Sequence, residues 1–464
     1  MALTINNLGT LSLLNILNKT SRAQDNTLLQ MATGSRINRG ADDPAGLLAL
    51  QKVDTELTAV NAGITNNQRT DAMLTVVDNA LREIGTQLQE IQRIANATAN
   101  DASLTIDERM ANQSQIDDAI AAIDRIVSNT NFNGKKLLDG SLAINTTGGT
   151  GLNDIRAYSR KSGSANASLV VAHTTGATVA TGANVMLAVA NNATTFTVQG
   201  KLGTAVISTV SNEALSSIRN KINAALNQTG VSAYLSASRL HVRSKDTGTS
   251  AFVRTKLISG SGPADVSAIG TDAVVTVNGQ KAAVDGKKVS YSGEGVSVSF
   301  EIGSLAVGGS ATITIQGSGA GGESGATFQL GTNGDTRATI GIAGVFTAQL
   351  GSLNDGYLKS LQSGGTASLL TDPTKAASIA REASKQIAQL QGRIGGFQKF
   401  QVRTATNSLN DVKEGLEKVR SSIADVDFAA ATAELNRSNV LMQSAISLLG
   451  LSNQQSAQVL SLLR

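Results

Sequence analysis

The sequence predicts a mixed fold, in which the amino- and carboxy-terminal segments form a long α-helical coiled bundle and a β-rich (α+β) outer domain is inserted between them. Glycine is concentrated in the middle: residues 141–365 hold 33 of the 46 glycines, against 8 in residues 1–140 and 5 in residues 366–464. Near both ends, apolar residues recur at alternating spacings of three and four, which is typical of helices packed side by side. The middle shows the two-residue alternation of strands instead.

The composition excludes several classes of function. The 464 residues suffice for more than one packed core. With no cysteine and two histidines, the chain has no disulfides or cysteine–zinc sites and little scope for transition-metal chemistry. Thirteen aromatic residues and a net charge of +4 favour neither nucleic acid nor anionic lipid as a partner. We expect no enzyme, no cofactor and no metal.

The amino terminus lacks the features of a secretory signal. Residues 1–18 carry no charged side chain, so the basic region of a signal peptide is missing. The apolar runs are far shorter than a membrane-spanning helix requires. We expect no membrane insertion, and any export to proceed without a cleaved signal peptide.

A seven-residue apolar repeat predicts the long helices. It is interrupted at Asn67, and residues 116–127 suggest a further helix with the same spacing. Repeats at opposite ends of the chain favour a bundle in which the two ends pair. We call the predicted contact residues the intrachain seam: Val53, Val60, Leu74, Val77, Leu81, Ile84, Leu88, Ile91, Leu409, Val412, Leu416, Val419 and Ile423.

The extreme ends differ from these amphipathic helices. Residues 438–463 contain no charge, and 12 of these 26 residues are Ser, Asn or Gln. A solvated helix face normally carries Lys and Glu, so a charge-free, amide-rich helix is better suited to being surrounded by protein. We expect both ends to be poorly ordered in a monomer and to fold against neighbouring chains. The alternative is that both ends pack into one monomeric core. The predicted subunit-packing residues are Leu8, Leu11, Leu14, Leu17, Met442, Ile446, Leu449, Leu460 and Leu463.

The middle of the chain predicts strands and one helix. Apolar residues alternate over residues 296–302 and 312–315, and Asn278-Gly279 predicts a two-residue hairpin. Leu215, Ile218, Ile222 and Leu226 fall on one face of a helix near residues 212–228.

No catalytic constellation stands out. The glycine-rich residues 317–325 lack the Lys-Ser/Thr of a phosphate-binding loop, so a flexible turn is favoured. His173 and His241 have no evident nucleophile partner and are expected at the surface. Asp425 and Asp427 lack the further oxygen donors of a calcium loop, so we interpret them as capping or solvated charges.

Motifs at both ends resemble those of bacterial flagellin, the subunit of the flagellar filament. The resemblance spans residues 1–140 and 327–464, and Pro44 stands where the family more often has Ala. The matching segments are residues 1–7 (MALTINN), 11–15 (LSLLN), 33–46 (TGSRINRGADDPAG), 131–138 (NFNGKKLL), 328–331 (FQLG), 393–398 (RIGGFQ), 423–429 (IADVDFA) and 459–464 (VLSLLR). Residues 195–240 resemble a module common in flagellin outer domains.

The resemblance implies a domain plan and a set of partners. Residues 1–40 with 430–464 would form the inner terminal-helix domain, residues 41–141 with 327–429 a helical rod with a short β-segment, and residues 142–326 the outer insert. The chain would polymerise with itself into an extracellular helical filament that serves swimming motility. It would leave the cell through the flagellar type III apparatus, and its other partners would be an export chaperone, the filament cap and the hook-associated junction proteins.

One segment departs from the family pattern. Many flagellins carry a receptor-recognised segment of the form LQRxREL, whereas this chain has Leu88, Gln89, Glu90, Ile91, Gln92, Arg93 and Ile94. An acidic residue stands at the usual first arginine, and a charge reversal in a contact weakens binding. We therefore expect weak or absent activation of the Toll-like flagellin receptor.

Two other functions stay open at this stage. A hook–filament junction protein would share the terminal helices and the export route. A surface adhesin or glycan-binding role could instead be carried by residues 142–326. The strong carboxy-terminal match and the large insert favour the filament subunit.

Overall fold

The computed structural model describes residues 8–99, 104–160, 165–187, 193–237, 239–260, 265–317, 325–353 and 355–462. The chain divides into two compact units. Residues 1–65 and 406–464 make up the first, which we call the terminal unit, and residues 66–405 make up the second, the central unit.

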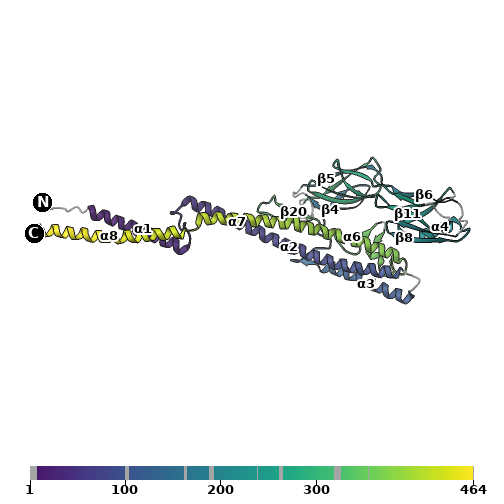
Figure 1. Ribbon diagram of the computed structural model, residues 1–464, viewed down its shortest axis with the longest axis horizontal. Coiled ribbons are helices and arrows are strands. Elements are labelled where there is room, and N and C mark those ends of the chain that lie inside the picture. Colours follow the sequence, from purple (N-terminus) through teal and green to yellow (C-terminus); the bar gives the residue numbers. More distant parts are fainter. Residues whose placement is uncertain are drawn as a thin grey trace. The chain divides into compact units, whose positions relative to one another are not determined.

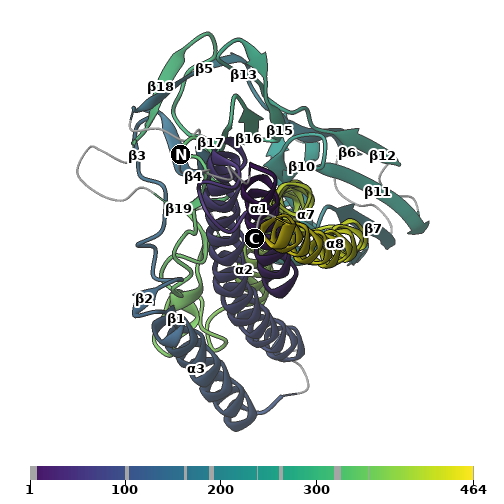
Figure 2. The ribbon, with the colours of Figure 1, turned by 90° about the vertical axis from the view of Figure 1, so that its left-hand side faces the viewer.

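The terminal unit is helical. It contains α1 (Leu8–Thr33), the beginning of α2 (Pro44–Thr98), nearly all of α7 (Thr404–Ala424) and α8 (Phe428–Leu462). α1 and α8 lie side by side in both views (Figures 1 and 2). The two ends of the chain therefore pair within one unit.

Backbone hydrogen bonds join the two breaks in these helices. Gly34 follows α1 with a φ of 71°, the left-handed conformation in which glycine ends a helix at little cost. Arg36 N donates to Ala424 O at 2.6 Å, and Val426 N donates to Gly34 O at 3.1 Å. The α1–α2 loop and the α7–α8 break are thus a single hydrogen-bonded joint.

The helices that leave this joint are capped by aspartates. Asp43 accepts a hydrogen bond from Gly46 N at 2.8 Å, and Pro44 occupies the first position of α2, where the N–H that proline lacks is not needed. Asp427 accepts from Ala429 N at 2.9 Å and from Ala430 N at 3.1 Å at the start of α8. Asp427 is therefore a helix cap, as the sequence suggested.

The helical part of the central unit packs around one apolar core. It comprises the rest of α2, α3 (Ile106–Asn129), the 3₁₀ turn η2 (Leu358–Leu361), α6 (Pro373–Phe397) and the π-helical turn η3 (Gln398–Arg403). Thr105 and Glu108 form a reciprocal capping box at the start of α3. Asn67 is fully buried on α2 and donates through Nδ2 to Leu330 O at 3.1 Å.

The β-rich part of the central unit has two further cores. One is formed on β4 (Leu152–Arg160), β5 (Ala167–Thr175), β13 (Val274–Val277), β15 (Ala283–Asp285), β16 (Lys288–Gly293), β17 (Val296–Ile302) and β18 (Ser310–Ile315). At the edges of one of its sheets lie β3 (Thr146–Gly148) and β14 (Gln280–Lys281). The other is formed on β6 (Val179–Leu187), β7 (Thr194–Gly200), β8 (Gly203–Thr209), α4 (Leu215–Ala224), β9 (Val231–Ser236), β10 (Arg239–Thr247), β11 (Phe252–Ser259) and β12 (Val266–Ile269). Short elements complete the unit: β1 (Asn131–Phe132), β2 (Lys135–Lys136), α5 (Leu226–Thr229), β19 (Ala326–Gln329), β20 (Arg337–Ile340), β21 (Gly351–Ser352) and β22 (Gly356–Tyr357).

Four larger antiparallel sheets make up this region within the described residues. Their strand orders are β6-β10-β9, β12-β11-β7-β8, β14-β13-β5-β18-β3 and β15-β16-β17-β4-β20-β19. Figure 2 shows β5 between β13 and β18. The alternating residues of β17 all point into the core, and Asn278-Gly279 forms the hairpin turn with a positive φ at both residues, as the sequence predicted.

The expectation of surface histidines is wrong for His173. Its side chain is only 6% exposed, and its Nδ1 lies 3.0 Å from Leu305 O. The backbone of His173 also bonds to Gly308 and Gly309, so the 303–309 loop covers the ring. Because that loop is more than 130 residues away in sequence, local pattern gave no sign of this burial.

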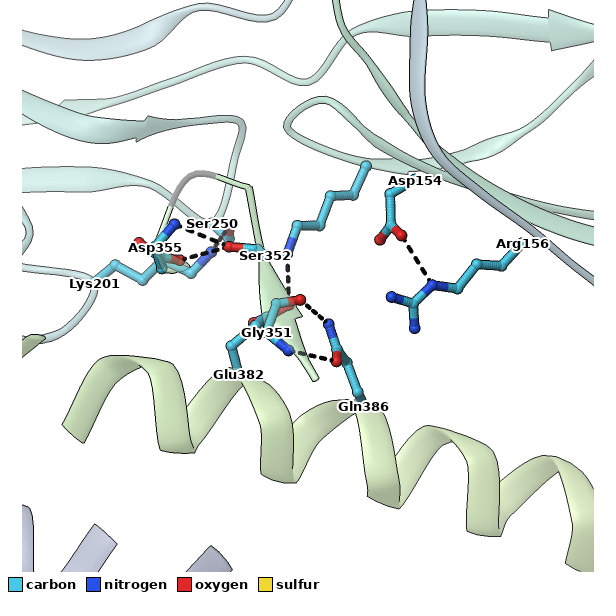
Figure 3. Close-up of polar contacts among 10 residues, drawn as sticks. Asp154, Arg156, Lys201, Ser250, Gly351, Ser352, Asp355, Glu382 and Gln386 are labelled. Atoms are coloured by element: carbon cyan, nitrogen blue, oxygen red, sulfur yellow. Dashed lines mark hydrogen bonds and ion pairs between the residues drawn. The ribbon is translucent and has the colours of Figure 1, made fainter. Parts of the chain in front are cut away.

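Polar contacts hold the insert on α6 within the central unit (Figure 3). Lys288 Nζ lies 2.7 Å from Glu382 Oε1 and joins the insert to the helix. Gln386 on the same helix holds Gly351, which lies outside the insert, by accepting from its N and donating to its O. The Arg393 guanidinium stacks on the Tyr158 ring. A groove of about 380 Å³ between β4, β16, β17 and α6 is lined by Tyr158, Lys288, Glu382, Gln386 and Arg393, among others.

Candidate assembly surface

Small residues line the contact between α1 and α8. Thr20 and Thr27 are buried on α1, seven residues apart, and Ala431, Ser438 and Ala445 are buried on α8 at the same spacing. We call these five residues the small-residue seam. Seven residues are about two helical turns, so each set lies on one face, and short side chains allow the two helices to approach closely.

Hydrogen bonds satisfy the two threonine hydroxyls at this contact. Thr20 Oγ1 donates to Ile16 O and Thr27 Oγ1 to Ala23 O, each at 2.9 Å within α1. Gln24 Nε2 donates to Asn439 Oδ1 at 2.9 Å and so links the two helices. An amide-rich α8 therefore finds one of its partners on α1.

Because small residues fill the contact, large apolar side chains remain outside it. Their exposed fractions range from 44% for Leu14 to 63% for Leu11. Exposed apolar groups at this density, on a helix whose residues from 438 onward carry no charge, are typical of an interaction surface. We call the set the candidate assembly surface: Leu11, Leu14, Ile16, Leu28, Phe428, Val440, Leu441, Ile446, Leu448 and Leu451.

The predicted subunit-packing residues take several positions. Leu11, Leu14 and Ile446 are exposed and belong to the candidate assembly surface. Leu17, Met442 and Leu449 are half-buried. Leu463 lies outside the described residues, and at Leu8 and Leu460 the structure describes the backbone only.

The intrachain seam is buried over most of its length. Val53, Val60 and Leu409 are buried in the terminal unit, and the six seam residues from Leu74 to Ile91 are fully buried in the central unit. Leu416 and Ile423 are half-buried. Val412 and Val419 are 46% and 45% exposed, because the described terminal unit covers only one side of the α7 stripe.

The small-residue seam was not predicted from the sequence, nor were several members of the assembly surface, such as Ile16, Leu28 and Val440. A signal was present: Ala431, Ser438 and Ala445 repeat every seven residues, as Thr20 and Thr27 do. A repeat of large apolar residues does not indicate this contact, because the contact is made of small residues.

The segment 88–94 presents a mixed face on α2. Leu88, Ile91 and Ile94 are buried in the helical core, whereas Gln89 and Arg93 are exposed. Arg93 pairs with Glu90 at 2.6 Å, and this side-chain hydrogen bond holds the pKa of the Glu90 carboxyl below its usual range. The outward charges of this segment are therefore already paired within the chain.

Nothing in the described part of the chain suggests a metal or membrane site. No group of three or more potential metal-ligating side chains occurs among the residues that were described. No helix within the described ranges is long and apolar enough to cross a bilayer.

Comparison with known proteins explains this arrangement. Residues 5–143 match the bacterial flagellin N-terminal helical region, residues 377–463 match the bacterial flagellin C-terminal helical region, and residues 195–246 match the flagellin hook IN motif. The chain belongs to the bacterial flagellin family. It is a structural subunit of the bacterial flagellar filament, and the family's filament is extracellular.

Individual flagellins are similar over nearly the whole chain. The flagellin of Clostridium tyrobutyricum is 25% identical over 95% of this chain and 96% of its own length. The B-type flagellin of Pseudomonas aeruginosa is 27% identical, and the match covers all of both chains. These matches favour a filament subunit over a junction protein or an adhesin.

Among solved structures, FliC from Burkholderia pseudomallei is 15% identical, with a TM-score of 0.25. The match covers 71% of this chain and 99% of that one.

Proposed function

We propose that this flagellin polymerises through the candidate assembly surface, with α1 and α8 of one subunit packing against the same helices of neighbouring copies. This proposal rests on ten exposed apolar side chains together with a carboxy-terminal stretch, residues 438–463, that has no charge. Burying the exposed half of one such side chain contributes about 1 kcal/mol. Ten of them contribute about 10 kcal/mol, which is of the same order as the cost of association, about 4–15 kcal/mol.

The repeated contact is heterologous, because a head-to-tail interface that does not close produces a helical polymer. The exposed Val412 and Val419 extend the apolar surface of the terminal unit along α7 and are further candidates for contact with a neighbour.

The family's plan applies to the rest of the chain. Residues 1–40 with 430–464 form the inner domain, residues 41–141 with 327–429 the rod, and residues 142–326 a projecting insert without enzymatic activity. Export proceeds through the flagellar type III apparatus without a cleaved signal peptide. An export chaperone, the filament cap and the hook-associated junction proteins are the other partners.

A pair of triple variants tests the role of the surface. Leu14→Ser/Ile446→Ser/Leu448→Ser removes three members of it, whereas Val206→Ser/Val210→Ser/Ile258→Ser removes three side chains of the insert that are at least as exposed. We expect the first variant to stay monomeric under conditions where wild type and the insert variant form filaments, as judged by sedimentation and electron microscopy. Filaments from both variants would contradict the proposal.

The same surface predicts a change of order upon assembly. Hydrogen exchange of α1 and α8 should be fast in the monomer, where few apolar contacts cover them, and slow in the filament. Equal protection in monomer and filament would show that neighbouring chains do not stabilise these helices.

A further inference from the structure

The sequence contains three Asn-Gly pairs, at residues 133–134, 278–279 and 333–334. In such a pair the glycine nitrogen can attack the asparagine side chain, because glycine has no side chain of its own to obstruct the approach. Whether the attack occurs depends on the backbone conformation of the asparagine and on the hydrogen bonds of the two groups. The structure therefore distinguishes sites that the sequence alone makes equivalent.

Two of the pairs are held in tight hairpin turns. Asn133 joins β1 to β2 with a φ of 51°, and Asn278 joins β13 to β14 with a φ of 49°. In this left-handed conformation, which such a turn requires, Cβ points away from the nitrogen of the following residue. The side-chain oxygen of Asn278 also accepts a hydrogen bond from Val170 N at 2.9 Å. Both asparagines must leave their hairpin before the attack can occur.

Asn333 is under neither constraint. It is exposed in the turn between β19 and β20, and its φ is not positive. Among the residues that the structure describes, neither the Asn333 side chain nor Gly334 N has a hydrogen-bond partner. Apart from its chain neighbours, no atom lies within 4 Å of the point that a Cβ of residue 334 would occupy. The two reacting groups are thus adjacent, solvated and not held apart.

We propose that Asn333 is a site of spontaneous deamidation. Gly334 N gives up its proton and bonds to Asn333 Cγ, the Cγ–Nδ2 bond breaks, and ammonia leaves with that proton, so that a cyclic imide closes. Water then opens the ring at Cγ, which yields aspartate, or at the main-chain carbonyl carbon, which yields isoaspartate. Nothing is oxidised or reduced, and water is the only co-reactant.

The isoaspartate product alters the turn that leads into β20. Its main chain runs through Cβ and Cγ, so one backbone atom is added ahead of Gly334. This turn is closed by two hydrogen bonds, from Thr336 N to Asn333 O at 3.1 Å and from Leu330 N to Thr336 O at 3.0 Å. Both products also place a negative charge two residues before Asp335. The converted chain should therefore exchange the Leu330 amide faster than the unconverted chain.

The test follows all three pairs in the same full-length monomer. The protein is incubated in mildly alkaline buffer, which favours loss of the Gly334 N proton, and conversion of each asparagine is followed by peptide mass mapping. Asn333 should convert at least about tenfold faster than Asn133 or Asn278, which corresponds to an opening cost of about 1.4 kcal/mol in the hairpins. Equal rates at the three sites, or no conversion at Asn333, would overturn the proposal.

A variant of the attacking residue tests the route. Gly334→Ala adds a methyl group beside the attacking nitrogen, and the open space around residue 334 accommodates it. Conversion at Asn333 should slow by at least about fivefold, equivalent to about 1 kcal/mol, while circular dichroism and thermal unfolding stay at wild-type values. An unchanged rate, or aspartate formed without isoaspartate in the wild-type chain, would exclude the cyclic imide and overturn the proposal.

Discussion

Replacing Ser438 by leucine should force α1 and α8 apart. Ser438 is only 2% exposed, and it lies in a seam whose other members are Thr and Ala. A leucine adds two heavy atoms where the short side chains leave little space. Overpacking of this kind costs about 1–3 kcal/mol.

Hydrogen exchange on the unaltered helix, measured in filaments, where α1 is expected to be protected, reports this cost. The amides around Thr20 and Thr27 belong to α1, so the substitution on α8 reaches them only through the contact between the helices. A loss of 1–3 kcal/mol of local stability corresponds to exchange faster by about 5- to 150-fold. Ser438→Ala keeps the small size and should change exchange by less than about threefold.

Exchange on α1 at the wild-type rate in Ser438→Leu would refute this prediction. That result would mean that the helices do not approach through small residues, and that the larger side chains are not excluded from the contact. Equal acceleration by the alanine and leucine variants would point to the lost hydroxyl rather than to size.

Three further predictions concern other parts of the chain. Asn67→Leu should lower the free energy of unfolding by about 1–3 kcal/mol in urea titrations, because it takes the Asn67 donor away from Leu330 O. Asn67→Ala, which also leaves a cavity, should lose about 2–4 kcal/mol. Burial acts to lower the pKa of Lys288, but the hydrogen bond and charge of Glu382 outweigh it and raise that pKa above 10.5. The stabilisation is therefore present below pH 10.5 and lost as the pH rises through the folded-state pKa, so Glu382→Gln should cost at most about 1 kcal/mol at neutral pH and abolish this alkaline loss. Monomer should activate the Toll-like flagellin receptor weakly in a cell reporter assay, because Glu90 pairs with Arg93 in residues 88–94; a response at ordinary flagellin potency would refute this.

The sequence predicted the helices well because their apolar period is long and regular. The residues from Leu74 to Ile91 were expected in a seam and are fully buried. Val412 and Val419 follow the same period and are exposed. Periodicity shows that a face is apolar, but only packing partners decide how much of that face one chain can cover.

The remaining features depend on contacts that sequence distance conceals. The burial of His173 comes from a loop far along the chain, and the polar contacts between Lys288 and Glu382 join the insert to a helix. The π-turn, by contrast, was legible: the eight-residue step from Ile394 to Val402 is visible in a heptad count. Local sequence patterns predict helices and strands, whereas contacts between residues far apart in the sequence decide which helices and strands pack together.

The joint between the helical breaks has a mechanical consequence. The bonds from Arg36 to Ala424 and from Val426 to Gly34 tie the two non-helical stretches together. A torque applied along the helices is therefore shared at this level by two hydrogen-bonded peptide segments, rather than carried by each segment separately. Sharing the load limits twisting at the two points where the helices are interrupted, which suits a filament subunit that must transmit rotation.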